Sequence, residues 1–348
     1  MRISNFRGEI DWKAMPQRID LIDKKIAYLL GKNSRLSNTA IAKALKLKRE
    51  VVSYRIKKMH ERNFLHGFVA RVNVRKIGMI AHNVYLKLKT PTNEKEMIDD
   101  LMKIKEITNL KNVGGRFDIS IETTSKNMEE FDVTLRKILD KYNASIQDYA
   151  ILNTIQEYPW DLDLLLEECP KELERLSQIK ESKGSSYHKE LENQEHNSEM
   201  VEVDPLDLKI LNLIKLNARM NLKDIADEAG SNFITVNKHL SRLVQKGVIS
   251  TFSTFFSLAQ MGYQMYPVLF NLRNLDERKF ITFMKHHPNI LWSYRTIGNW
   301  NYQVNIFARS NAHFHDLFND IRQNFSENIV SFDTIMVFNS FKVEQRIE

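Results

Sequence analysis

The stretch DLIDKKIAYLLGKNSRLSNTAIA at residues 20–42 recurs as DPLDLKILNLIKLNARMNLKDIA at residues 204–226. This repeat indicates how the whole chain is organised. Shared positions include the pairs Asp20/Asp204, Asp23/Asp207, Ile26/Ile210, Arg35/Arg219 and Ile41/Ile225. The match runs without a gap over about 70 residues and, after a one-residue deletion, continues through Gly115/Gly298. Solenoid repeats are much shorter, about 20–50 residues, so the sequence indicates duplication of a whole unit.

Bulk composition places the chain among globular proteins of more than one domain. It has 348 residues, of which 43% are hydrophobic and 10% aromatic. No apolar run is long enough to span a bilayer and charges interrupt the N-terminal residues, so we expect a cytoplasmic protein. The single cysteine, Cys169, excludes an intrachain disulfide framework and a cysteine-rich zinc site. We expect neither a metal nor a cofactor.

The charge is unevenly distributed along the chain. The formal net charge is +7, but residues 159–204 carry 13 Asp/Glu against 5 Lys/Arg, which leaves the remainder at +15. A polycation of this kind attracts nucleic-acid phosphates or an anionic membrane surface. Charge alone does not choose between these two partners.

The first part of each unit has the pattern of three short helices. Asp20 precedes the first helix as its expected N-cap, Ser37 precedes the second, and a third runs from about Lys48 to Arg62. A tight step between the last two helices is typical of a helix-turn-helix. The alternating segment 66–78 that follows predicts a strand or wing.

Residues 18–66 hold 13 Lys/Arg and 4 Asp/Glu, a net charge of +9 centred on the helix that would enter a DNA major groove. In the second copy residues 202–250 have a net charge of only +1, so we expect weaker DNA binding there, or a packing or partner-binding role. The candidate DNA-contacting residues are Lys48, Arg49, Ser53, Tyr54, Lys57 and Lys58 in the first copy and Asn232, Thr235, Asn237 and Lys238 in the second.

The second part of each unit reads as βαββαβ. Residues 84–88, a helix near Met97, a strand at 109–113, residues 115–123, a helix at 127–142 and residues 146–155 follow in order, and the second copy repeats this order from residue 268. Such a split βαβ sheet buries one face under its helices and leaves the other for pairing. The fold class is therefore α+β, with two copies of a winged helix-turn-helix plus a ferredoxin-like domain.

The ordered motifs resemble those of the Lrp/AsnC (leucine-responsive regulatory protein) family of bacterial and archaeal transcription regulators, in a tandem-duplicated form. They are Asp20 and Asp23, Arg35-Leu36-Ser37, Ile41-Ala42, Arg55-Ile56, Gly78 and Gly115-Arg116-Phe117-Asp118, with second-copy counterparts through Gly298-Asn299-Trp300-Asn301. The resemblance implies a sequence-specific regulator that binds double-stranded DNA and is not an enzyme. It further implies that the ferredoxin-like domain dimerises through its sheet.

In many family members an amino acid binds near the Gly-x-aromatic-Asp loop, so the resemblance implies effector binding at Gly115, Arg116, Phe117, Asp118, Gly298, Asn299, Trp300 and Asn301. Asn301 stands where the family has an acidic residue, and an amide cannot neutralise an ammonium group. An equally open interpretation is that both loops merely support the interface between the sheets.

We expect an N-terminal extension (1–17), winged helix-turn-helix 1 (18–76), ferredoxin-like domain 1 (77–158), an acidic linker with a short amphipathic helix at 164–179 (159–202), winged helix-turn-helix 2 (203–260) and ferredoxin-like domain 2 (261–346). The two units should pack sheet to sheet as a pseudo-dimer within one chain, and homodimers or higher oligomers are compatible with this arrangement.

Two alternatives remain open. The double architecture also resembles fused sirohaem decarboxylases, for which the tetrapyrrole-binding candidates are His286, His287, Tyr294, Arg295 and Arg116. The other alternative is an architectural protein that coats DNA with little sequence preference.

Overall fold

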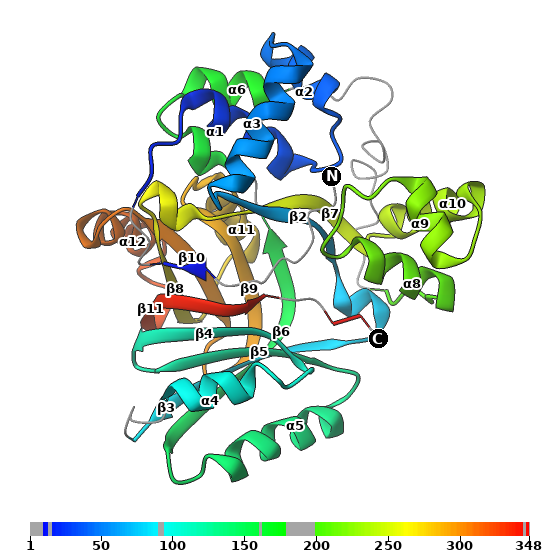
Figure 1. Ribbon diagram of the computed structural model, residues 1–348. Helices are drawn as coiled ribbons and strands as arrows, with labels where there is room; N and C mark the ends of the chain where they lie inside the picture. Colours follow the sequence, from blue (N-terminus) through cyan, green and yellow to red (C-terminus); the bar gives the residue numbers. More distant parts are fainter. Residues whose placement is uncertain are drawn as a thin grey trace.

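The computed structural model describes residues 10–12, 16–89, 94–159, 162–178, 199–343 and 346–347. One helical head lies at the top of the view and a second at its right, beside a central arrangement of strands (Figure 1). Head 1 comprises α1 (Leu21–Lys32), α2 (Asn38–Leu45), α3 (Arg49–Glu61) and strand β2 (Leu65–Val72). Head 2 comprises α8 (Pro205–Ile214), α9 (Leu222–Ala229), α10 (Phe233–Gln245) and β7 (Ile249–Phe256). The duplicated sequence therefore folds into duplicated elements.

Side-chain caps fix where the head helices begin. The Asp20 carboxylate accepts a hydrogen bond from the Asp23 backbone N–H, and the Ser37 hydroxyl accepts one from Ala40 N–H. Asp204 and Asp207 form a reciprocal capping box at the start of α8. Such caps satisfy backbone donors that have no partner within the helix, which is why these motifs recur in both copies.

The strand predicted to form a wing pairs with its own duplicate. β2 and β7 run antiparallel, and together they make a two-stranded sheet between the heads (Figure 1). The cores of both heads merge across it: Phe68 and Phe252 are buried in one apolar cluster. The two heads are thus joined by backbone pairing, a feature that the alternating sequence pattern does not specify.

Each ferredoxin-like domain forms a four-stranded sheet with two helices outside it. Domain 1 has β3 (Ile80–Leu88), α4 (Glu94–Leu101), β4 (Ile107–Gly115), β5 (Ile119–Ser125), α5 (Met128–Lys141) and β6 (Ile146–Pro159). Domain 2 has β8 (Gln264–Leu272), α11 (Glu277–His286), β9 (Ile290–Gly298), β10 (Tyr302–Ala308), α12 (Asn311–Phe325) and β11 (Ile329–Val343). Short 3₁₀ turns, η1 (Val74–Ile77) and η4 (Leu258–Met261), connect each head to its sheet.

The two sheets join at both edges. The strand order is β4-β5-β3-β6 in domain 1 and β9-β10-β8-β11 in domain 2, and antiparallel pairs β6–β9 and β11–β4 connect them. The long strands β6 and β11 pair first within their own sheet and then with the other sheet. The ring of eight strands is closed, which removes exposed sheet edges.

Aromatic side chains fill the space between the sheets. Phe117 and Trp300, at matching positions of the two copies, are 1% and 3% exposed and meet edge to face with ring centroids 6.0 Å apart. The Tyr85 hydroxyl donates to Gln303 Oε1 at 2.8 Å, so a buried hydrogen bond also connects the sheets. This packing realises the pseudo-dimer expected from the sequence.

Gly115 and Gly298 lie where a strand of one domain approaches a strand of the other closely. Both have positive φ, and an added Cβ would lie 2.8 Å from the Thr334 carbonyl oxygen and 2.4 Å from the Ile151 carbonyl oxygen, respectively. A side chain at either position would therefore displace the adjoining strand.

Two segments outside the repeat differ from what the sequence suggests. Within the N-terminal extension, β1 (Ile10–Asp11) pairs with β11, and Trp12 is buried and donates to the Ser340 hydroxyl. The helix expected at 164–179 is broken in two, η3 (Asp163–Leu166) and α6 (Pro170–Ser177). Pro170 lacks an N–H, so it begins a new helix instead of continuing one.

Candidate nucleic-acid interface

Helix α3 presents a mixed basic and aromatic face to solvent. Val52 and Met59 are buried, and Ile56 packs against the same core. Of the six residues predicted to contact DNA, Lys48, Arg49, Tyr54 and Lys57 are exposed, and Tyr54 reaches 61% exposure. Among the described residues, Lys48 and Arg49 form no ion pair, so their charges remain available to phosphates.

Lys57 and Lys58 share one acidic neighbour. Glu61 lies 2.8 Å from Lys58 Nζ and 3.8 Å from Lys57 Nζ. The hydrogen bond that Lys58 Nζ donates to the Glu61 carboxylate raises the pKa of Lys58 above its ordinary value. These two lysines therefore offer less net charge than two isolated ones.

Ser53 already has a structural partner. Its hydroxyl accepts a hydrogen bond from Asn38 Nδ2 at 2.8 Å, and Asn38 Oδ1 in turn accepts one from Arg219 of head 2. This chain of contacts runs from head 2 through Asn38 of α2 to α3. Helix α3 is the reading helix of head 1, the helix predicted to enter the DNA major groove. A role of Ser53 at a base edge stays a prediction, and it would compete with this contact.

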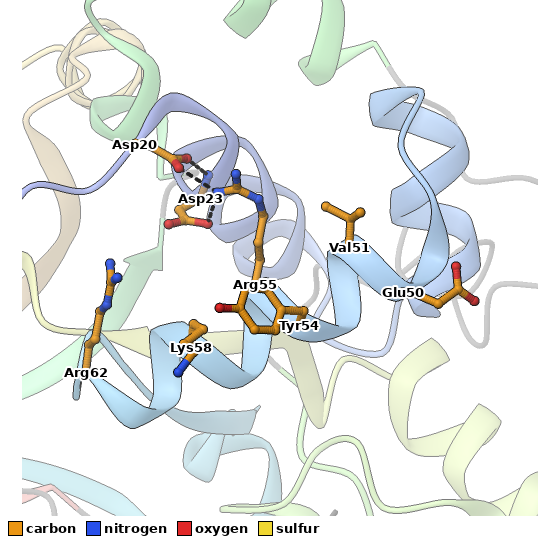
Figure 2. Close-up of a pocket in the computed structure, with 8 residues that line it drawn as sticks. All are labelled: Asp20, Asp23, Glu50, Val51, Tyr54, Arg55, Lys58 and Arg62. Carbon is orange, nitrogen blue, oxygen red and sulfur yellow. Dashed lines mark hydrogen bonds and ion pairs between the residues drawn. The ribbon is translucent and has the colours of Figure 1, made fainter.

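Arg55 anchors α3 to α1. Its Nη1 lies 2.6 Å from Asp20 Oδ2 and 2.8 Å from Asp23 Oδ1, as Figure 2 shows. The hydrogen bond to Asp20 raises the pKa of Arg55, while burial raises the pKa of Asp23. The three residues line a shallow depression of about 550 Å³ with Glu50, Val51, Tyr54, Lys58 and Arg62. These ion pairs fix the orientation of α3 relative to α1.

Head 2 makes the same anchor from different residues. His239 occupies the position of Arg55, and its Nδ1 lies 2.8 Å from Asp207 Oδ1. Arg242 also pairs with the fully buried Asp207 carboxylate. Asp204, Asp207 and His239 bring potential metal-ligand atoms within 4.8 Å of one another, but the Arg242 guanidinium already supplies a positive charge there.

The reading helix of head 2, α10, has a different exposed face. The Asn232 side chain caps the helix by accepting from Thr235 N–H, Thr235 and Asn237 are half-buried, and Lys238 is exposed. Phe233 and Ile234 are 54% and 66% exposed at the positions of Arg49 and Glu50. These two apolar residues were missed at the sequence level, because their exposure depends on where the helix begins.

Arg35 and Arg219 exchange contacts between the heads. Arg35 Nη1 donates to the Ala218 carbonyl oxygen, and Arg219 Nη2 donates to the Leu36 carbonyl oxygen at 3.0 Å. Each guanidinium also lies over a phenylalanine of the other head, at 5.4 Å for Phe252 and 5.0 Å for Phe68. Burial lowers the pKa of Arg219 to about 10, and the nearby Arg35 acts in the same direction. Both arginines are structural, although the sequence counts them in the basic charge.

The acidic segment after β6 covers part of the head 1 charge. Lys24 pairs with Glu168 and Lys25 with Glu172, each at 3.2 Å, and Lys32 Nζ donates to the Ser177 carbonyl oxygen. Glu168 also pairs with Arg309 of domain 2. The net charge of +9 thus overstates what reaches the reading surface.

The predicted effector loops serve the sheets. The Asp118 carboxylate accepts from Leu88 N–H at 2.8 Å and pairs with Lys87, while the Asn301 amide bonds both the N–H and the carbonyl oxygen of Leu272. Gly115, Phe117, Gly298 and Trp300 lie at the contacts between the sheets, whereas Arg116 and Asn299 are exposed. Asp118 and Asn301 thus both hydrogen-bond the backbone of a neighbouring strand, a task that an amide performs as well as a carboxylate.

The tetrapyrrole-binding candidates do not converge. Arg116 pairs with Asp333 at 3.1 Å, and Arg295 pairs with Glu277 at the start of α11. His287 follows the other end of α11 and faces Asp320 of α12. Tyr294 is half-buried on β9, and burial raises its pKa well above the ordinary value.

Comparisons with known proteins agree with this architecture. Residues 19–60 match the AsnC-type helix-turn-helix domain, residues 203–250 a winged helix-turn-helix DNA-binding domain, and residues 268–347 the Lrp/AsnC ligand binding domain. An HTH-type transcriptional regulator of Pyrococcus abyssi is 30% identical over 122 residues, which cover 35% of this chain and 82% of the relative. The chain belongs to the Lrp/AsnC family. It is a DNA-binding transcription regulator with two family units.

A second relative and a solved structure complete the comparison of this Lrp/AsnC protein. An HTH-type transcriptional regulator of Pyrococcus furiosus is 27% identical over 141 residues, 40% of this chain and 95% of the relative. The crystal structure of the siroheme decarboxylase NirDL has a TM-score of 0.61, covers 94% of both chains and is 9% identical. The latter likeness concerns the fold: a single chain with the same double arrangement. No helix in the described part of the chain has the length and apolar character needed to cross a membrane.

Proposed function

We propose that one chain acts as a covalent counterpart of a two-fold dimer and reads an asymmetric DNA site with two unequal heads. The observation that carries this proposal is the reciprocal pairing of the heads: Ser34 N–H donates to the Phe252 carbonyl oxygen, and Ala218 N–H donates to the Phe68 carbonyl oxygen. With the Arg35 and Arg219 exchange, these bonds hold both reading helices in one rigid pair. An asymmetric pair favours an asymmetric operator.

Head 1 supplies most of the phosphate affinity in this proposal. Its reading helix begins with the exposed Lys48 and Arg49, whereas α10 begins with Phe233 and Ile234. Counterion release scales with the number of phosphates neutralised, so losses in head 1 should weaken binding to every sequence. Head 2 then contributes sequence preference more than affinity.

Selection of binding sites from random duplex DNA tests the proposal. The full chain should recover two unlike half-sites, and its affinity for the selected duplex should exceed that for random DNA about 1,000-fold or more at fixed salt. Recovery of a symmetric palindrome by a single chain would contradict the asymmetric arrangement. A ratio near one would support the architectural alternative, in which the protein coats DNA.

We propose in addition that an amino acid or a similar small molecule modulates DNA binding through the ferredoxin-like domains, in the cytoplasm where the DNA is. The match of residues 268–347 to the Lrp/AsnC ligand binding domain supports this. Thermal unfolding of the full chain with each of the common amino acids checks it, because a ligand that binds the native state raises Tm. No change in Tm or in DNA affinity with any of them would contradict an amino-acid effector.

The fold neighbour favours a second candidate, a sirohaem-decarboxylase-like enzyme. Against it, Arg116, Arg295 and His287 are each engaged with a different acidic residue on separate elements. We therefore propose that the chain is not an enzyme. Titration with an iron-uroporphyrin III analogue decides between them: a shifted tetrapyrrole absorption band that disappears in Arg116→Ala would favour the enzyme.

A further inference from the structure

The first turn of α10 exposes two apolar side chains at a position where head 1 has charges. Phe233 and Ile234 are 54% and 66% exposed, and the corresponding Arg49 and Glu50 are exposed and charged. Adjacent exposed apolar side chains on the surface of a soluble domain are typical of a contact surface. The first turn of the reading helix is therefore apolar in head 2 and charged in head 1.

Their place in the helix restricts what they contact. In a helix-turn-helix, the N-terminal residues of the second helix contact base edges in the major groove. Asn232 caps α10, which fixes Phe233 and Ile234 as its first two residues. The only apolar group that bases present in this groove is the 5-methyl group of thymine.

We propose that Phe233 and Ile234 contact thymine methyl groups, so that head 2 recognises a thymine-containing half-site. This rests on the proposed function, because head 2 must reach the same duplex as head 1. The exposed Lys238 follows on the same helix and suits an adjoining phosphate. The bonds between the heads keep head 2 beside head 1, so DNA bound by head 1 is presented to head 2 at high effective concentration.

Replacement of thymine by deoxyuridine tests the proposal, since it removes the methyl group and keeps base pairing. The probe is the duplex recovered by selection with the full chain, and the half-site of head 1 is the one whose preference changes in Arg49→Ala. Deoxyuridine in the other half-site should weaken binding about fourfold for each contacted methyl group, the factor expected for one buried methylene-sized group. Deoxyuridine in the half-site of head 1 should change the affinity less.

Two variants connect the effect to these residues. Phe233→Ala with Ile234→Ala should weaken binding and abolish the response to deoxyuridine, while Arg49→Ala should weaken binding and retain it. Phe233→Arg, which installs the head 1 residue at an exposed position, should fold, bind DNA and lose the part of the response that Phe233 provides, while the part that Ile234 provides remains. Val133→Ala is the matched control, because Val133 is 68% exposed on α5, outside both heads.

Three results would overturn the inference: specific binding that tolerates every deoxyuridine replacement, a double alanine variant with unchanged DNA affinity, or a half-site of head 2 without thymine. In these cases the regulator with two heads would stand, and the apolar pair would be assigned to a protein partner. Absence of any sequence-specific DNA binding by the full chain would instead contradict the proposed function itself.

Discussion

The two heads keep one framework and differ in what they present to a ligand. Both use two aspartates to anchor the reading helix, but Arg55 bridges them in head 1, whereas His239 and Arg242 share the task in head 2. At the start of the reading helix, Arg49 and Glu50 are replaced by Phe233 and Ile234. The aspartates that anchor the reading helix are the same in both copies, whereas their partners and the outward-facing residues at the start of the helix differ in chemistry.

The largest expected effect comes from breaking the joint between the heads. Arg219→Ala removes hydrogen bonds to the Leu36 carbonyl oxygen and to Asn38 Oδ1, as well as the contact over Phe68. Loss of two charge-assisted bonds should lower the free energy of unfolding by about 3–4 kcal/mol. Chemical denaturation measures this, with Lys223→Ala on the exposed side of α9 as control. Equal stability of variant and parent would mean that the heads do not depend on this joint.

A pH effect should be specific to head 1. Burial, with a smaller effect of nearby His60, lowers the pKa of His66 to about 4, and head 2 has Ser250 at this position. Because the folded-state pKa is below the unfolded value of about 6.5, protonation favours the unfolded chain. Stability should fall by about 3 kcal/mol between pH 6.5 and pH 4 from this residue.

Comparison with His66→Ser, the residue of head 2, isolates this effect. Denaturation curves of parent and variant should diverge across that pH window, with the variant losing less stability on acidification. Parallel curves would show that His66 does not titrate in a buried environment.

DNA affinity should depend unequally on cations of the two heads. Lys48→Ala with Arg49→Ala should weaken binding to all sequences about tenfold at moderate salt, and flatten the slope of log K against log salt by about 2. Lys57→Ala with Lys58→Ala should do less, because Glu61 already offsets their charge. Lys238→Ala should have the smallest effect. Fluorescence anisotropy across a salt series measures all three, and an equal loss from Lys238→Ala would make the heads electrostatically equivalent.

The smallest expected effect is that of Asp118→Asn, which gives domain 1 the residue of domain 2. Asn301 bonds the backbone of Leu272 as Asp118 bonds that of Leu88, so only the partly exposed pair with Lys87 is lost. The free energy of unfolding should change by less than about 1 kcal/mol. Calorimetry with an identified amino-acid effector then becomes informative: unchanged binding removes Asp118 from the effector site.

Much of the fold could be predicted from the sequence because the signals are local. Asp20 and Ser37 cap helices, as the patterns of polar residues before apolar stripes predict. The duplication provided a second test of every element. The order of strands and helices in both ferredoxin-like domains agrees with the expectation for the same reason.

What could not be predicted depends on contacts between distant residues. The strand after α3 carries an alternating pattern, but its partner β7 lies about half a chain away. In the sequence, Arg35 and Arg219 count as basic surface residues. In the fold, the side chain of each contacts the backbone of the other head. Likewise, the sequence does not show that the acidic linker residues Glu168 and Glu172 pair with Lys24 and Lys25 of α1.

The most direct test of two unequal heads on one duplex is hydroxyl-radical footprinting of the full chain on its selected site, at a measured stoichiometry. The account predicts that one chain protects two segments, about one helical turn or a multiple of it apart, and that Lys48→Ala with Arg49→Ala diminishes both segments. Protection of one segment only, or a symmetric footprint that requires two chains, would contradict it.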